Sequence, residues 1–302
     1  MRRFPLSPNG PEVSSIAYGV WRLGDDPNGT SVSNVREKID TCLENGITTF
    51  DHADIYGLYT CEGLFGAALA EAPELRDQME IVTKCGIRYP CDGLPDAEVK
   101  HYDATAETIE ACVNRSLLEL NIETIDVLLI HRPDWLTRAE DTAKGLRSVV
   151  DQGKVRSVGV SNYSTSQFDL LARYLGDTPV TNQIEVSLLH MDGIYDGTLN
   201  QCEQQGIHPM AWSPLAGGQL LAGDDADAVR TRNALTSISE ELDATPDQVA
   251  LAWVAALPSQ PQVVIGTNQP SRIRDAAQSD TIELTRTQWY QLWEAARGSE
   301  VP

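Results

Sequence analysis

The chain has 302 residues, an ordinary apolar content and a formal net charge of −21. No run of 18 apolar residues occurs, which argues against a membrane-spanning helix. The opening "MRRFPLSPNG" lacks the apolar segment of a signal peptide. The charge argues against a nucleic-acid partner, because a phosphate backbone would be repelled. We therefore expect a cytoplasmic protein that binds neither membranes nor nucleic acid.

The acidic residues are spread along the whole chain, which has only five lysines. A diffuse acidic surface suits a protein that stays soluble in concentrated salt, where charge repulsion is screened within roughly 3 Å at 1 M. We hypothesise a halophilic, salt-adapted protein, with an ordinary acidic enzyme as the alternative. Loss of the fold on adding salt, rather than on removing it, would contradict salt adaptation.

Short β-type runs alternate with helical patterns along the chain. The predicted strands are 14–19, 46–51, 79–84, 125–131, 155–161, 180–186, 207–213 and 262–267. The predicted helices are 32–45, 61–71, 105–121, 138–152, 165–175, 194–206, 227–257 in two pieces, 270–278 and 285–297, the last with Thr285 as its N-cap.

This alternation predicts parallel strand pairing, because each helical crossover returns the chain to the same end of the sheet. Eight such units without a break in composition fit a (β/α)8 TIM barrel, with residues 1–302 as a single domain. A doubly wound sheet is the rival, but no G-x-G-x-x-G follows the first strand. We expect residues 1–13 to plug the barrel bottom and 285–297 to form an extra C-terminal helix. The long segments 85–104 and 214–228 belong on the catalytic face.

The cysteines and histidines suggest neither a disulfide framework nor a metal site. The six cysteines form no Cys-x-x-Cys pair, so free thiols are expected. Cys85 and Cys91 flank one loop, and the sequence leaves open whether they meet. Because the five histidines are scattered, we predict no metal ligand set.

Polar residues follow the second, third and fourth predicted strands at their ends: Asp51, Lys84 and His131, with Tyr56 five residues after Asp51. A barrel brings strand ends to one rim. A lysine near a phenol is expected to lower the phenol's pKa, while Asp51 holds Lys84 and keeps it charged. His131 can hydrogen-bond the same substrate oxygen. This set predicts proton transfer to a carbonyl oxygen, which serves carbonyl reduction beside a hydride donor.

Seven motifs in order make the chain resemble the aldo-keto reductase superfamily over essentially its full length, and most closely a bacterial subgroup. They are "FDHADIYG", "IVTKCG", "LLIHRPD", "GKVRSVGVSNYS", "TNQIEVS", "AWSPLAGG" and "VVIGTNQPSRI". The resemblance implies a TIM barrel that binds NADPH in an extended pose. It also implies Tyr56 as the proton donor, with Asp51, Lys84 and His131 completing a catalytic tetrad.

The resemblance further assigns residues to each part of the cofactor. Asp51, Ser161, Asn162 and Gln183 would lie at the nicotinamide, and Trp212 would stack on its ring. The first loop at the cofactor would be Gly19, Val20 and Trp21. The pyrophosphate loop would be Ser213, Pro214, Leu215, Ala216 and Gly217. The adenosine phosphate site would be Gly266, Thr267, Asn268 and Arg272.

Each of these positions also has an ordinary structural interpretation. Asp51 and Lys84 alone would suit a structural ion pair, and His131 a strand cap. Ser161-Asn162 would suit a helix N-cap, a role that Ser164 fills equally well. We expect His52 to face the barrel wall and Asp54 to support the loop.

The cofactor preference rests on few residues. Arg272 is the only cation in "GTNQPSR", and the helix continues with Asp275 and Ala276 where many family members have a Glu-Asn pair. We predict NADPH, with NADH as the less favoured cofactor, and a plain surface role as the alternative for Arg272.

The predicted function is that of an NADPH-dependent oxidoreductase that reduces aldehydes or ketones to alcohols. One alternative is an NADPH-binding regulatory or sensor protein with little turnover. Another is an alcohol or sugar dehydrogenase working in the oxidative direction. The partner is a small-molecule carbonyl substrate, and the substrate and the oligomeric state stay open. Candidates for lining the substrate pocket are Trp21, Tyr59, Tyr89, Trp135 and His190.

Overall fold

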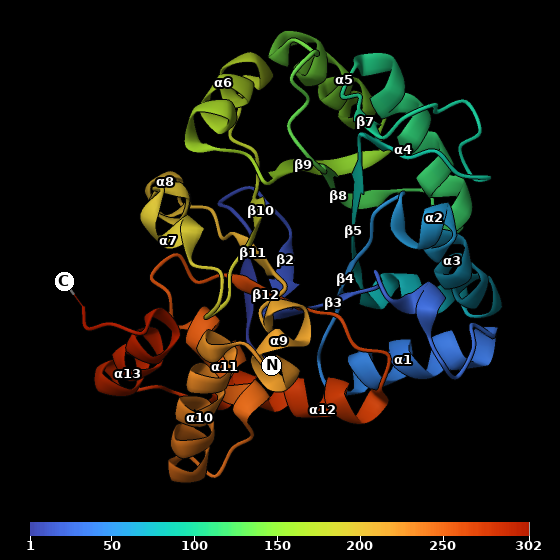
Figure 1. Cartoon of the computed structure of the whole chain (residues 1–302). Helices are drawn as coiled ribbons and strands as arrows, with labels where there is room; N and C mark the ends of the chain where they lie inside the picture. The colour runs from blue at the N-terminus through green and yellow to red at the C-terminus, as the bar shows by residue number, and fades with distance from the viewer. Residues whose placement is uncertain (302) are drawn as a thin grey trace.

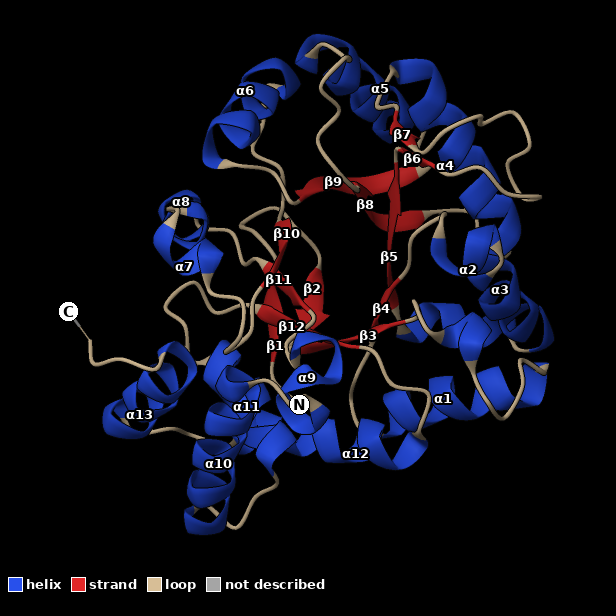
Figure 2. Cartoon of the chain, viewed as in Figure 1, coloured by secondary structure: helices blue, strands red, loops and turns tan. Residues whose placement is uncertain are grey.

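A closed barrel of eight parallel strands forms the centre of the protein, in a computed structural model that describes residues 1–301 (Figure 2). Neighbours around the ring follow the chain order, so the predicted TIM barrel is confirmed. The strands are β3 Ile16–Gly19, β4 Thr49–Asp51, β5 Glu80–Cys85, β8 Ile125–Ile130, β9 Val155–Ser161, β10 Asn182–Glu185, β11 Met210–Trp212 and β12 Gln262–Ile265.

Helices surround the strands on the outside of this ring (Figure 1). They are α1 Val32–Glu44, α2 Tyr56–Tyr59, α3 Cys61–Glu71, α4 Ala106–Leu120, α5 Ala139–Asp151, α6 Thr165–Leu175, α7 Asp192–Tyr195, α8 Thr198–Gln205, α9 Gln219–Ala222, α10 Ala226–Glu241, α11 Pro246–Ala255, α12 Pro270–Gln278 and α13 Arg286–Arg297. Short 3-10 turns cover Leu23–Asp25, Pro73–Gln78, Ala216–Gly218 and Ser279–Thr281.

Local sequence signals fix where many of these helices begin. Ser164, Thr245 and Thr285 each form a capping box with the glutamine three residues on. The predicted N-cap at Thr285 is therefore confirmed. Because Ser164 caps α6, Ser161 and Asn162 are left free for another role.

The prediction of one helix over 194–206 is wrong, because two helices occupy this region. α7 ends at Tyr195, and α8 starts at Thr198. Gly197 separates them with a φ of 89°, a left-handed conformation that glycine adopts without steric cost.

A two-stranded hairpin closes one end of the barrel, as predicted for the first residues. Its strands are β1 Arg3–Pro5 and β2 Glu12–Ser14, paired antiparallel. Leu6 and Val13 are completely buried and pack with barrel residues such as Val127 and Met210. The hairpin thus supplies apolar side chains to the barrel interior.

The C-terminal helix α13 lies outside the ring beside α10 and α11 (Figure 1). The rings of Trp253 in α11 and Trp289 in α13 stack at 4.8 Å between centroids. Each indole N–H donates to the other tryptophan's backbone carbonyl oxygen at 3.1 Å. This reciprocal pairing anchors the predicted extra helix.

All six cysteines are free thiols, so Cys85 and Cys91 do not pair. The long segment after β5 contains a small hairpin of β6 Ile87–Arg88 and β7 His101–Tyr102. Within residues 1–301, no helix has the length and apolar character needed to cross a membrane.

Candidate active site

Three neighbouring strands place the predicted catalytic side chains at one end of the barrel. Asp51 is the last residue of β4, Lys84 lies near the end of β5, and His131 follows β8. Tyr56 starts the short helix α2. Gly57 has a φ of 58°, and a Cβ there would lie 2.7 Å from the Cys61 sulfur. Only glycine fits this turn, which sets the position of Tyr56.

Lys84 is the centre of the predicted tetrad and is completely buried. Its Nζ donates to Asp51 Oδ2 at 2.9 Å, to the Tyr56 hydroxyl oxygen at 2.9 Å and to the His52 backbone oxygen at 2.8 Å. All three ammonium protons are therefore used. The buried lysine holds the carboxylate on one side and the phenol on the other.

The charges around Lys84 stabilise its ammonium form. Burial alone would lower the pKa of Lys84, but Asp51 and the Tyr56 hydroxyl outweigh burial and raise this pKa above its usual value. Both the contact and the direction of this shift agree with the role expected for Asp51, which stays a prediction.

The expected lowering of the Tyr56 pKa is wrong in its direction. Burial raises the pKa of Tyr56, and the nearby Lys84 charge offsets this only in part while Asp51 adds to it. The phenol thus keeps its proton at neutral pH. A protonated phenol is the form that a proton donor needs.

His131 stands beside the phenol as a neutral imidazole. The Tyr56 and His131 rings meet edge to face, with centroids 5.8 Å apart. Burial lowers the pKa of His131 well below its usual value, and the positive charges of Lys84, Arg132 and Lys100 lower it further. Its Nδ1 has no hydrogen-bond partner among residues 1–301. A neutral imidazole can share a substrate oxygen with Tyr56.

Four residues assigned to the nicotinamide form one connected group on the next three strands. Gln183 Nε2 donates to Asp51 Oδ1 at 2.8 Å, which links β10 to the tetrad. The Asn162 side chain donates to Ser161 Oγ at 2.7 Å and accepts from Trp212 Nε1 at 3.2 Å. Ser161 Oγ donates to the Gln183 backbone oxygen at 2.9 Å. The structure thus brings Ser161, Asn162, Gln183 and Trp212 together, as expected for residues at the ends of neighbouring strands.

The loop after β11 has an unusual backbone that suits a phosphate. Ser213, Ala216 and Gly217 all have positive φ, and Pro214 and Leu215 lie between them. A Cβ at Gly217 would meet nothing within 4 Å, so open space lies over the backbone there. Successive turns of this kind form anion-binding concavities of N–H groups. The loop therefore fits the pyrophosphate of a dinucleotide.

Close backbone packing joins β3 to β12. A Cβ at Gly19 would lie 3.0 Å from the Ile265 backbone oxygen, so a side chain there would push the strands apart. Val20 is completely buried, while Trp21 is 58 % exposed. Gly266, Thr267 and Asn268 follow β12 and lead into α12.

Arg22 is a candidate cofactor residue that the sequence analysis missed. Its Nη1 donates to the Gly266 backbone oxygen at 2.8 Å, and its Nη2 lies 3.4 Å from the Gly217 backbone oxygen. Asn268 Nδ2 donates to the Arg22 backbone oxygen at 2.6 Å. Arg22 thus ties the two loops assigned to the phosphates, and Arg272 is not the only cation at this end of the site.

A family model described as "Aldo/keto reductase family" matches residues 15–297, nearly the whole chain. The chain belongs to this family. Members act on small-molecule carbonyl compounds and generally use nicotinamide cofactors.

Named relatives match this aldo/keto reductase from end to end. A 6-dehydroglucose reductase of Agrobacterium fabrum is 46 % identical, and an oxidoreductase of Escherichia coli named YdhF is 42 % identical, each over 100 % of both chains. A crystal structure of the thermostable aldo-keto reductase Tm1743 in complex with epalrestat superposes with a TM-score of 0.81. It covers 98 % of this chain and 100 % of its own, at 24 % identity, so it supports the fold.

The residues expected to line the substrate pocket lie on several loops of this reductase. The Tyr59 hydroxyl donates to the Ile87 backbone oxygen and accepts from the Tyr89 N–H, which fixes the hairpin after β5. Trp135 packs edge-on against Tyr102 of that hairpin. His190 instead lies 3.8 Å from Glu185.

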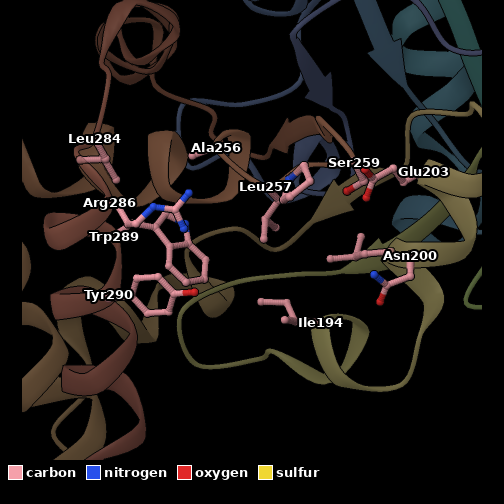
Figure 3. Close-up of a pocket in the computed structure, with 12 residues that line it drawn as sticks. Ile194, Asn200, Glu203, Ala256, Leu257, Ser259, Leu284, Arg286, Trp289 and Tyr290 are labelled. Atoms are coloured by element: carbon pink, nitrogen blue, oxygen red, sulfur yellow. The ribbon is translucent and has the colours of Figure 1, made fainter. Parts of the chain in front are cut away.

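A cavity of about 450 Å³ lies elsewhere, on the flank of the barrel. Figure 3 shows it between Ile194 and Asn200 on one side and Trp289 and Tyr290 on the other. Its lining within residues 1–301 contains none of the predicted catalytic or cofactor residues. This cavity is therefore separate from the candidate site at the carboxyl ends of the barrel strands.

Two buried residues, His52 and Asp54, lie between Asp51 and Tyr56 in the chain. Asp54 is 4 % exposed, and its backbone N–H donates to the Lys84 backbone oxygen at 3.0 Å. Burial raises the pKa of Asp54 to about 7, and the charge of Glu62 contributes. His52, also buried, packs edge-on against Phe65. The supporting roles expected for His52 and Asp54 stay predictions, since Asp54 Oδ1 and both His52 ring nitrogens have no hydrogen-bond partner among residues 1–301.

Asp54 predicts a loss of stability as pH rises from about 4 to 7. An unfolded aspartate loses its proton near pH 3.9, whereas folded Asp54 keeps its proton up to about pH 7. The folded state then binds the extra proton, so the unfolding free energy falls by about 1.4 kcal/mol per pH unit in this window. In Asp54→Asn, the unfolding free energy measured with urea is expected to fall less between pH 5 and pH 8 than it does in the wild type.

The exposed Asp224 provides the control for this experiment. Asp224→Asn is expected to keep the pH dependence of the wild-type protein. Equal pH dependence in wild type and Asp54→Asn would show that Asp54 titrates normally in the folded state.

Proposed function

We propose that the protein reduces aldehyde or ketone carbonyls with NADPH, and that Tyr56 donates the proton. The observation that supports this most is the position of Lys84 Nζ, which contacts both Asp51 and the Tyr56 hydroxyl at 2.9 Å. A structural ion pair needs no third contact to a phenol. The neighbouring His131 makes this a site for a carbonyl oxygen.

In the proposed reaction, bound NADPH supplies the hydride. Tyr56 passes its phenolic proton to the carbonyl oxygen as that oxygen becomes negative. Lys84 stabilises the resulting phenolate, because its ammonium already contacts the phenol oxygen. His131, neutral at physiological pH, orients the same oxygen with a hydrogen bond. Ser161, Asn162 and Gln183 would hold the carboxamide of the nicotinamide.

A panel of aldehydes and ketones tests the proposal, with loss of NADPH absorbance as the readout. The panel should include 6-dehydroglucose, because two relatives carry the name 6-dehydroglucose reductase. Turnover of any panel carbonyl supports the reductase. Tight NADPH binding without turnover would favour a cofactor sensor, and oxidation of alcohols alone would favour a dehydrogenase.

The proposed preference for NADPH predicts a selective effect of Arg272. Arg272 lies in the first turn of α12, is exposed and makes no ion pair within residues 1–301. An arginine there would bind a 2′-phosphate with charge-assisted hydrogen bonds. Arg272→Ala is expected to weaken NADPH binding about tenfold more than NADH binding, as measured by quenching of tryptophan fluorescence.

Arg274→Ala is the matched control, because Arg274 lies about 200° around the same helix. Equal losses of NADPH affinity in the two variants would point to a general charge effect. Cytoplasmic location and salt adaptation stay predictions from the composition.

A further inference from the structure

Two cations lie on the segments next to the proposed catalytic residue His131, in a protein whose net charge is −21. Arg132 directly follows His131 after β8, and Lys100 directly precedes β7. The Tyr102 ring of β7 meets Trp135 of the loop after β8, with centroids 5.8 Å apart. The hairpin and the loop therefore lie against each other at the barrel mouth. The charges of both cations reach His131, since both lower its pKa.

Arg132 is not neutralised by an acid of the protein. Its guanidinium carbon lies 5.8 Å from the centroid of the Trp212 ring, and the residue is half-buried. Among the described residues, neither Arg132 nor Lys100 has a carboxylate within 4.0 Å.

The acid nearest in sequence, Asp134, is held by other groups. Its side chain accepts from the Ala104 and Leu136 backbone N–H groups and from the Thr137 hydroxyl. These three donors already bond the Asp134 carboxylate, which makes no ion pair with Arg132 among the described residues. The guanidinium of Arg132 is free to bind a ligand.

We propose that Arg132, assisted by Lys100, forms an anion subsite, and that the physiological carbonyl substrate carries a carboxylate, phosphate or sulfonate group. This inference rests on the proposed carbonyl reduction. An arginine presents a planar fork of donors that matches such groups in two parallel hydrogen bonds. The overall acidic charge repels anionic substrates, so only a local cation of this kind would retain one beside Tyr56 and His131.

A neutral polyhydroxylated substrate is the competing occupant. Hydroxyl groups also accept from a guanidinium, but bonds between charged partners are about twice as strong. The ratio of kcat/KM for the charged and neutral forms of the same aldehyde therefore distinguishes an anionic substrate from a neutral one.

Matched substrate pairs measure this selectivity at constant ionic strength. One pair is succinate semialdehyde and its methyl ester, and the other is glyceraldehyde 3-phosphate and glyceraldehyde. The wild-type kcat/KM is expected to favour the charged member of at least one pair by about tenfold to a hundredfold. The pair with the larger ratio distinguishes a carboxylate from a phosphate site. Arg132→Gln is expected to reduce the ratio about tenfold, and Arg132→Lys to keep part of it.

Arg138→Gln is the matched control, because the Arg138 side chain is 83 % exposed and lies six residues further along the chain. It removes the same charge and is expected to keep the wild-type ratio. Three results would overturn the proposal: a wild-type preference for the neutral members, an unchanged ratio in Arg132→Gln, or an equal loss of selectivity in Arg138→Gln.

A binding measurement keeps this test separate from the proposed function. Calorimetric titration of the NADP⁺-loaded protein with unreactive succinate and with inorganic phosphate reports the subsite without turnover. Binding that Arg132→Gln weakens supports the subsite even if no panel carbonyl is reduced. If neither anion binds, or if Arg132→Gln weakens NADPH binding as much as anion binding, the subsite is wrong.

Discussion

Tyr56→Phe is expected to lower kcat for carbonyl reduction by at least about a hundredfold, the usual scale of general acid catalysis. The substitution removes the hydroxyl that contacts Lys84 and leaves the aromatic ring beside His131. Lys84 keeps its bonds to Asp51 and to the His52 backbone oxygen, so the fold should persist. Cofactor affinity, measured by fluorescence titration, is expected to stay near the wild-type value.

Tyr59→Phe is the control within the same short helix. The Tyr59 hydroxyl bonds to the backbone of Ile87 and Tyr89 in the segment of the β6–β7 hairpin, and not to the tetrad. Its loss is expected to change KM more than kcat. A Tyr56→Phe enzyme with wild-type kcat would overturn the assignment of the proton donor.

The pH dependence of reduction gives a second readout. Burial raises the pKa of Tyr56, so the phenol stays protonated through the neutral range. The rate of reduction in the wild type should therefore hold from neutral to mildly alkaline pH and fall only as the phenol ionises. A decline centred near neutral pH would show that another group supplies the proton.

The barrel could be predicted from the sequence because its signals are local and repeated. Each strand is a short apolar run followed by a helical pattern, and the parallel crossover then fixes the neighbours around the ring. The grouping of the candidate tetrad at one end of the barrel could be predicted for the same reason. Asp51, Lys84 and His131 all lie at or next to the carboxyl end of a strand, and in a closed parallel barrel these ends share one rim.

Other features depend on contacts that only the folded chain shows. The direction of the Tyr56 pKa shift depends on burial outweighing a contact with Lys84, and neither quantity is written in the local sequence. The Arg22 side chain is positioned by hydrogen bonds to two loops that lie about 200 residues or more away in the chain. The break at Gly197 was hidden because the flanking residues continue a helical pattern.

Lys84→Met is expected to destabilise the protein by about 3–5 kcal/mol, because it leaves the buried Asp51 carboxylate without its cation. Gln183 still donates to Asp51 Oδ1, but an amide does not neutralise the charge. The same substitution should lower kcat by at least about a hundredfold, because the phenolate left by Tyr56 loses its positive partner. Urea unfolding at fixed salt measures the first effect, and NADPH oxidation measures the second.

The double variant Asp51→Asn, Lys84→Met separates a structural ion pair from a catalytic one. It removes both buried charges, so it is expected to be more stable than Lys84→Met alone. Its activity should stay as low as that of Lys84→Met, because Tyr56 still lacks the ammonium that contacts its oxygen. If activity returned together with stability, Lys84 would serve only to hold the barrel mouth together. If stability returns without activity, the reaction needs the charged groups of Lys84 and Asp51 themselves and not only the stability that their ion pair gives.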